Sequence, residues 1–331
     1  MAQRHNACGN TWALPLSPAR VSPLQNWSDI LTFGGGRYFL LPAASFLLAL
    51  LLADPVVLLA VFRTPRLLQE PRYRLLANTL ISDILYALVT FTLTATNVSP
   101  IIFPSMLCEA LLMLQCVTQF ASMLGVTAMG ANIYLAVNWP LRYHALFPPS
   151  RALHAIAALW LLSAAVPVTI LILMGRSWSL LCDMPVCTLS MLFFLPQPSP
   201  VLLELDYIAL MVSCTLCFLL MSVCFYLLVW KTRRAGVWQG VPPRARQTIS
   251  VHSLIFILYF LPSTVVIGQK LLLTRKAKDT VSSLYVSLTI ESVVNMLPKA
   301  LTPYLYGFRC AELSLAVRSL FSGRTRVVPG G

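Results

Sequence analysis

The sequence predicts an all-α membrane protein: a bundle of seven transmembrane helices with a short amphipathic C-terminal helix. Of its 331 residues, 58% are hydrophobic and only 11% are charged, with a mean hydropathy of +0.77. Soluble domains carry about 25% charged residues, so this much apolar surface requires lipid as its solvent. The apolar residues do not alternate with a period of two, which argues against a transmembrane β-barrel.

Seven apolar segments are long enough to span a bilayer. A helix needs about 20 residues to cross roughly 30 Å of hydrocarbon. The segments cover residues 38–62, 74–96, 105–137, 151–174, 201–230, 248–273 and 282–307. We therefore divide the chain into an N-terminal tail (1–37), a bundle (38–307) and a C-terminal region (308–331) that holds the amphipathic helix.

Basic residues predict the orientation. With the N-terminus outside, fifteen lysines and arginines fall in cytoplasmic stretches, eight fall outside, and Lys299 lies within the seventh segment. This bias follows the positive-inside rule. Contact with anionic inner-leaflet lipid accounts for the net charge of +13, so we expect no nucleic-acid partner. Asn26 in Asn-Trp-Ser is a predicted glycosylation acceptor, and Asn97 in Asn-Val-Ser, near the membrane, is a weaker one.

Four cysteines fall on the predicted outer side, where disulfides form. They are Cys8, Cys108, Cys182 and Cys187. Four cysteines allow three connectivities, and the residues alone leave all three open.

Three charged residues are predicted at one depth in the membrane. Asp54, Asp83 and Lys299 each lie nine or ten residues from an arginine that marks the inner end of a segment, which is about 13–15 Å along a helix. Each such charge costs at least about 2.5–3.5 kcal/mol. We therefore expect the first, second and seventh helices to adjoin and these groups to face each other, with Ser122 and Asn78 as hydrogen-bond donors. The network is either a static packing element or a switch.

Several motifs, taken in order, resemble those of the rhodopsin-like G-protein-coupled receptors. They are "LLANTLISDILYAL" (75–88), "NIYLAVNWPLRY" (132–143), "FILYFLP" (256–262) and "TPYLY" (302–306). The resemblance implies a plasma-membrane receptor that senses an outer ligand and signals by helix rearrangement to a heterotrimeric G protein. It assigns seven residues to switch motifs: Asn132, Ile133, Tyr134, Pro262, Thr302, Pro303 and Tyr306.

The chain departs from the family at several of these positions. Ile133 replaces the arginine that engages the G protein, and Asn132 replaces the preceding acid, which puts G-protein coupling in doubt. The tryptophan of the sixth helix is replaced by Phe260, and the asparagine before the seventh-helix proline by Thr302.

The intramembrane charges also differ from the family pattern. The family usually has an asparagine where this chain has Asp54, and its sodium site lies at the position of Asp83. Lys299 would fill that cavity with an ammonium group, so Asp83 should pair with Lys299 and not with sodium. Opsins carry a lysine seven residues before the proline, where this chain has Met296, so we expect no retinal and no other cofactor.

The resemblance also implies a ligand pocket that opens outward. Its expected residues are Gln115, Gln119, Tyr207, Tyr259, Phe260, Glu291 and Asn295. Gln115 occupies the place of the aspartate in amine receptors, which indicates a non-aminergic ligand: a small molecule, odorant-like in one interpretation, or a peptide. The family pattern joins Cys108 to the second outer loop, with Cys187 preferred and Cys182 as the alternative.

Other functions remain as alternatives. A non-signalling seven-helix protein, such as a decoy receptor or trafficking partner, is the main one because of Ile133. A transporter would use the intramembrane charges, but we find no inverted repeat. The sequence holds no metal-ligand pattern, phosphate loop or nucleophile elbow, so we expect neither a metal site nor an enzyme.

Overall fold

The structure is a computed structural model. It describes residues 35–99, 103–139, 141–178, 288–309 and 311–322, short pieces at 183–184, 187–188, 254–255, 257–259 and 285–286, and single residues and pairs from 208 to 230. Several residues singled out by the sequence lie outside these ranges: Cys8, Asn26, Cys182, Tyr207, Phe260 and Pro262.

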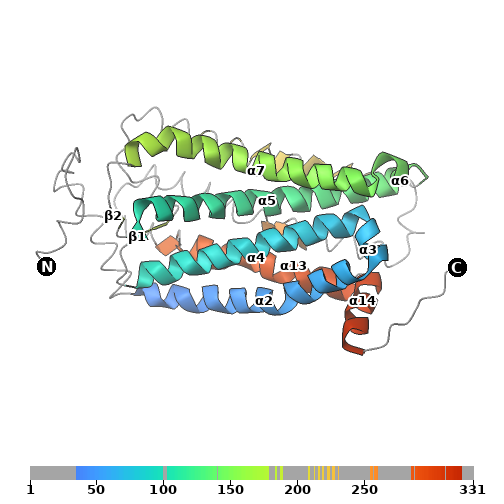
Figure 1. Ribbon diagram of the computed structural model, residues 1–331, viewed down its shortest axis with the longest axis horizontal. Helices are drawn as coiled ribbons and strands as arrows, with labels where there is room; N and C mark the ends of the chain where they lie inside the picture. The colour runs from blue at the N-terminus through green and yellow to red at the C-terminus, as the bar shows by residue number, and fades with distance from the viewer. Residues whose placement is uncertain are drawn as a thin grey trace, which may run out of the picture.

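Long helices arranged side by side form the body of the molecule (Figure 1). In chain order the helical elements are η2 (Gly35–Phe39), α2 (Leu40–Arg63), α3 (Pro65–Gln69), α4 (Pro71–Val98), α5 (Ser105–Asn138), α6 (Tyr143–Leu146), α7 (Pro149–Trp178), the π-helical turn η3 (Ile290–Val294), α13 (Met296–Arg309) and α14 (Ala311–Ser322). Within the described residues, four helices are long and apolar enough to cross a membrane: 35–63, 71–98, 106–136 and 149–169.

Prolines set several helix starts. Thr64 and Glu70 have extended backbones, and Pro65 and Pro71 open the next helix after each of them. Proline suits a first helical turn because the amide hydrogen it lacks would have no intrahelical acceptor there. For this reason α4 begins ahead of the apolar segment predicted from residue 74.

Helix α4 lies at the centre of the packing and contacts α2, α5, α7 and α13. The face that α2 presents to the core repeats every three or four residues, as a helix requires. That stripe consists of Ala43, Leu47, Leu50, Asp54, Val57 and Val61. On the other side α4 and α5 meet closely, because a Cβ atom on Gly125 would collide with the Thr79 hydroxyl.

Buried hydroxyl groups in these helices bond to their own backbone. Each of the following donates to the carbonyl four residues before it: Thr79, Ser82, Thr94, Thr118 and Thr127. Such bonds satisfy polar side chains where no water is present. The polar residues inside the bundle are therefore compatible with a lipid environment.

One end of the bundle is closed by a small sheet and a disulfide. Strands β1 (Phe103–Pro104) and β2 (Asp183–Met184) pair in antiparallel fashion. Cys108, in the first turn of α5, is bonded to Cys187. The buried Asn97 amide donates to the Cys187 carbonyl at 2.8 Å and accepts from its amide at 2.7 Å. This end of α4 is thereby tied to the segment around Cys187.

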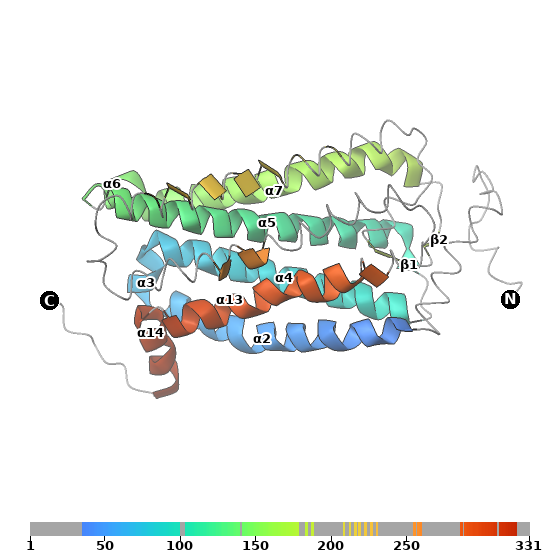
Figure 2. The ribbon, with the colours of Figure 1, turned by 180° about the vertical axis from the view of Figure 1, so that it is seen from behind.

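At the opposite end, α14 turns away from the direction of the long helices (Figures 1 and 2). Leu313 and Ala316 are buried against the bundle. Glu312 accepts from Arg72 at 2.7 Å and from the Tyr73 hydroxyl at 3.0 Å, so the start of α14 is fixed to the start of α4.

Candidate functional site

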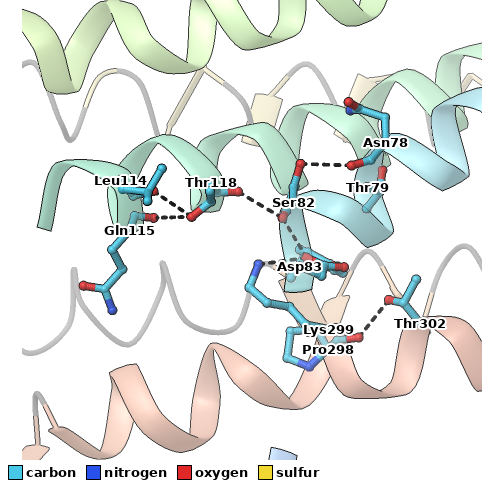
Figure 3. A network of polar contacts seen from close by, with 12 residues as sticks. Asn78, Thr79, Ser82, Asp83, Leu114, Gln115, Thr118, Pro298, Lys299 and Thr302 are labelled. Carbon is cyan, nitrogen blue, oxygen red and sulfur yellow. Dashed lines mark hydrogen bonds and ion pairs between the residues drawn. The ribbon is translucent and has the colours of Figure 1, made fainter. Parts of the chain in front are cut away.

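Lys299 and Asp83 form a buried ion pair in the middle of the bundle. The Lys299 Nζ atom lies 3.1 Å from Asp83 Oδ1, and both side chains are fully buried. Ser122 on α5 donates to the same oxygen at 2.6 Å, and the Tyr259 hydroxyl donates to Oδ2 at 2.7 Å. Figure 3 shows Lys299 reaching from α13 toward Asp83 on α4. The expected contact between the lysine and an aspartate of the second helix is thus present.

Aromatic rings surround the ammonium group of Lys299. Its Nζ atom lies 4.5 Å from the ring centre of Tyr86 and 5.2 Å from that of Tyr259. A cation over the face of an aromatic ring is stabilised by the ring quadrupole, more strongly where water is excluded. The two tyrosines therefore compensate part of the desolvation of the lysine.

Asp54 departs from the expected arrangement. It is fully buried, but among the described residues no ion pair joins it to Lys299, and neither of its carboxylate oxygens has a hydrogen-bond partner. A shared depth along the helices does not determine the direction in which a carboxylate points. The lysine therefore bonds to Asp83, and no bond between Lys299 and Asp54 is present among the described residues.

Asn78 and Tyr259 also have other partners than expected. The Asn78 Oδ1 atom accepts from the Trp160 indole at 2.8 Å, which joins α4 to α7, so Asn78 is not a donor to the charge network. Tyr259, expected as a wall of the ligand pocket, donates instead to Asp83. The network therefore includes a residue from the sixth apolar segment.

A second polar cluster surrounds the Tyr86 hydroxyl. Thr90 and Asn295 face that hydroxyl, and Glu291 lies close enough to act on it electrostatically. Gln115 donates to the Thr90 hydroxyl at 3.1 Å. The Oε1 atoms of Gln115 and Gln119 are buried and have no hydrogen-bond partner within the described part of the chain.

Glu291 belongs to the π-helical turn η3. At the end of this turn the backbone amide of Asn295 donates to the carbonyl of Ile290, five residues earlier, at 2.9 Å. The extra residue per turn did not follow from the sequence pattern. Tyr86 lies between the two sites, since its hydroxyl meets this cluster and its ring meets the ammonium of Lys299.

The motif Asn132–Ile133–Tyr134 at the inner end of α5 makes contacts between uncharged side chains. Asn132 is buried and accepts from the Tyr143 hydroxyl at 3.0 Å, while Ile133 is half-buried. Burial raises the pKa of Tyr143 further above neutral pH, and the residue donates this bond as a neutral hydroxyl. Tyr134 meets Trp139 edge to face, with ring centres 6.2 Å apart.

The motif on the seventh helix lies in α13. Thr302, Pro303 and Tyr306 are all buried, and the Thr302 hydroxyl donates to the Pro298 carbonyl at 2.8 Å. That bond runs along α13, past Lys299, and leaves the lysine side chain directed at α4 (Figure 3).

Sequence reasoning missed Tyr86, and a signal for it existed. Tyr86 follows Asp83 by three residues, so the two share a face of one helix. A tyrosine one turn above a buried aspartate is therefore in reach of the cation that pairs with it.

The fold and the motifs agree with a known family. Residues 55–306 match the family described as 7 transmembrane receptor (rhodopsin family), so the chain belongs to the rhodopsin-like G-protein-coupled receptors. Members of this family are receptors, built as seven-helix bundles that cross the plasma membrane several times.

Two of the relatives are similar over most of the chain, and a third is similar over about a quarter of it. Human "Probable G-protein coupled receptor 148" is 30% identical over 294 residues, which is 87% of this chain and 83% of the relative. Mouse somatostatin receptor type 5 is 28% identical over 306 residues, which is 88% of this chain and 80% of the relative. Human galanin receptor type 3 is 34% identical over 89 residues, covering 26% of this chain and 24% of the relative.

Proposed function

We propose that this receptor binds a non-aminergic ligand at the outer side of the bundle and signals inward by rearranging the helices around Lys299. The observation that supports this most directly is one hydrogen-bonded network shared by α4, α5, α13 and Tyr259. A buried network has few alternative pairings, so a change in one contact moves several helices together.

The polar cluster around Tyr86 is the candidate ligand site. It offers the amide oxygens of Gln115 and Gln119, to which no described residue donates a hydrogen bond, together with Glu291 and Asn295. Buried polar atoms without partners are rare in folded proteins, and bound ligands or water account for many of them. Tyr207, Phe260 and Pro262 belong to the same proposal but lie outside the described residues.

Peptides are the first ligand class to test. Two relatives are named as receptors for somatostatin and galanin. An odorant-like small molecule is the second class. For either ligand class, Gln115 has no negative charge with which to bind an amine. Its Oε1 atom can accept a hydrogen bond from a neutral amide group of the ligand.

The proposed topology has the N-terminus outside and residues 308–331 in the cytoplasm. The Cys108–Cys187 disulfide lies at the end where α5 begins, and disulfides form in oxidising compartments. Arg63, Arg66, Arg72 and Arg74 lie at the other end of α2 and α4. The charge bias and the disulfide thus support the same orientation.

The amphipathic helix α14 is proposed to rest on lipid at the inner face. Its buried residues Leu313 and Ala316 contact the bundle, while Leu315 and Phe321 are 66% and 76% exposed. Two large apolar groups on the free side of such a helix fit the boundary between headgroups and acyl chains.

A ligand screen tests the receptor proposal. Cells that display the chain at their surface are challenged with a neuropeptide library and an odorant library, and the response is read by whole-cell impedance, which requires no particular transducer. For any active compound, Gln115→Leu and Glu291→Gln should weaken the response at least tenfold, whereas Gly130→Ala should not. Active compounds that are insensitive to both substitutions would refute the proposed site.

The alternative function is a non-signalling receptor, either a decoy or a trafficking partner. Ile133 and the neutral Asn132–Tyr143 contact favour it, because the arginine that engages the G protein in the family is absent. Ligand-independent G-protein activation is compared for the native chain and Ile133→Arg at equal surface expression. Activity in the native chain supports signalling, whereas activity in neither supports the alternative.

A further inference from the structure

Asp54 is a fully buried carboxylate. It lies on the core-facing stripe of α2, which packs against α4 and α13. Neither carboxylate oxygen has a hydrogen-bond partner among the residues that the structure describes. An ionised carboxylate loses its hydration when it is buried and is tolerated only with a counter-charge and hydrogen bonds.

The groups nearest to Asp54 do not supply that compensation. Asp83 is close enough to repel a charge on Asp54. Tyr259 is also within electrostatic range, but its hydroxyl donates to Asp83. The ammonium group of Lys299 bonds to Asp83 as well. A second negative charge on Asp54 would therefore add repulsion to a pair that is already neutral.

Among the described elements packed against α2, no other one brings a counter-charge to this level. The elements η2 and α3 flank α2 in the chain, so their charged and titratable residues lie at the two ends of α2. The charged residues of α14 lie at the inner end of the bundle (Figure 1). Glu291 on η3 lies two helical turns outward from Lys299. The remaining titratable or charged groups on these elements are Arg37, Tyr38, Arg66, Arg72, Tyr73, Arg74, Tyr86, Tyr304, Tyr306, Arg309, Glu312 and Arg318.

We propose that Asp54 is a proton-binding site: in this packing of the helices it holds a proton, and a neutral carboxylic acid occupies the core. A protonated carboxyl has nearly the shape of an asparagine amide, the side chain that the family usually has at this position. Asp54 is then a titratable counterpart of that asparagine, and the proton is its ligand.

The helix itself offers an acceptor for that proton. Pro55 follows Asp54 inside α2 and has no amide hydrogen, so the carbonyl of Leu51 lacks its usual intrahelical donor. Aspartate side chains reach carbonyls three or four residues before them. Rotation of the protonated side chain therefore provides a bond that the ionised form cannot make.

Proton binding links the packing of the bundle to pH. Release of the proton leaves two carboxylates and one ammonium group in a region of low dielectric, so any arrangement that gives Asp54 a partner or water becomes favoured. Because the folded chain holds a proton that an unfolded chain releases, its stability falls as pH rises. This inference does not depend on the ligand or on the transducer.

Infrared spectroscopy of the full chain in lipid nanodiscs tests the proposal. The carbonyl stretch of a protonated carboxyl is compared at neutral pH in the native chain, in Asp54→Asn and in Glu312→Gln, the control at an exposed carboxylate. We expect a band that disappears in Asp54→Asn and persists in Glu312→Gln. Labelling the native chain with 13C-carboxyl aspartate should shift that band, which keeps the test decisive if Asp54→Asn does not fold.

A second measurement separates a proton from a metal cation. Unfolding midpoints are recorded against pH in sodium chloride and in N-methylglucamine chloride. The native chain should lose stability relative to Asp54→Asn as pH rises, to the same extent in both salts. A missing protonated band would overturn the proposal, as would a stabilisation by sodium that requires Asp54. Neither result would bear on ligand binding at the Tyr86 cluster.

Discussion

The Nζ atom of Lys299 lies 3.1 Å from Oδ1 of Asp83, in a part of the bundle where both side chains are fully buried. This contact joins the last helix of the bundle to the second across 216 residues of sequence. Ser122 and Tyr259 complete the coordination of the carboxylate. Several consequences can be measured.

Substituting Lys299 alone should lower the free energy of unfolding far more than substituting both Lys299 and Asp83. Lys299→Met leaves Asp83 buried without a counter-charge, and breaking a buried pair on one side costs about 3–5 kcal/mol. Adding Asp83→Asn to Lys299→Met should recover most of that loss. Chemical unfolding in detergent micelles measures the cycle, and equal losses in the single and double variants would contradict it.

The exposed pair provides the comparison for that cycle. Arg72 and Glu312 are 46% and 61% exposed, and exposed pairs contribute about 0–1 kcal/mol. Glu312→Gln should therefore change the stability by less than about 1 kcal/mol.

Sodium should not stabilise the native chain through Asp83, because the ammonium group of Lys299 already occupies that carboxylate. In Lys299→Met the carboxylate is left for another cation, and a cation that binds only the folded state raises its stability. Melting temperatures in sodium and in N-methylglucamine chloride should coincide for the native chain and differ for Lys299→Met. Sodium dependence of the native chain that Asp83→Asn abolishes would be the opposite result.

The ring of Tyr86 should matter to Lys299 more than its hydroxyl. Tyr86→Phe retains the aromatic face 4.5 Å from the ammonium group, whereas Tyr86→Leu removes it. A desolvated cation–π contact contributes about 2 kcal/mol, so Tyr86→Leu should be less stable than Tyr86→Phe by roughly that amount. If Lys299→Met is introduced first, the two variants should become similar.

Gly125 should tolerate no side chain, whereas Gly130 should. A β-carbon at Gly125 meets the Thr79 hydroxyl, and over-packing costs typically about 1–3 kcal/mol. Nothing lies within 4 Å of a β-carbon at Gly130, so Gly130→Ala should be neutral or stabilising through helix propensity. Thr79→Ala should rescue Gly125→Ala in thermal unfolding, and a failure to rescue would place the cost elsewhere.

Asn26 should carry a glycan and Asn97 should not. Both stand in acceptor triplets, but the Asn97 amide is buried and bonded twice to the backbone of Cys187. Asn26→Gln should abolish the mobility shift produced by peptide N-glycosidase, while the native Asn97 should contribute none. A shift that persists in Asn26→Gln would contradict this assignment and weaken the proposed orientation of the N-terminus.

Features governed by distance along a helix could be predicted from the sequence. The rise per residue is fixed, so Asp83 and Lys299 were expected at one level, and the two side chains are in contact. The motif order predicted the family, and the family pattern implied the Cys108–Cys187 pairing. The ends of the helices were predicted less accurately, because Pro71 starts α4 three residues ahead of its predicted apolar segment.

Features governed by rotation about a helix could not be predicted in the same way. Whether Asp54 faces Lys299 depends on how α2 turns against α4, and this depends on the packing of many side chains at once. Tyr259 was assigned to the ligand pocket for the same reason, although it bonds to Asp83. The π-helical turn at Ile290–Val294 changes the angular position of Glu291 and has no simple signature in the sequence.

The contact of Arg72 and Tyr73 with Glu312 lies at the surface, unlike the pair at Lys299. Mobile ions screen charges that water can reach, within about 8 Å at physiological ionic strength, but act little on a pair enclosed by helices and lipid. The contacts of Lys299 on α13 and of Glu312 on α14 therefore have different surroundings. Raising the salt concentration should weaken the contact between Arg72 and Glu312 and leave the contact between Lys299 and Asp83 unchanged.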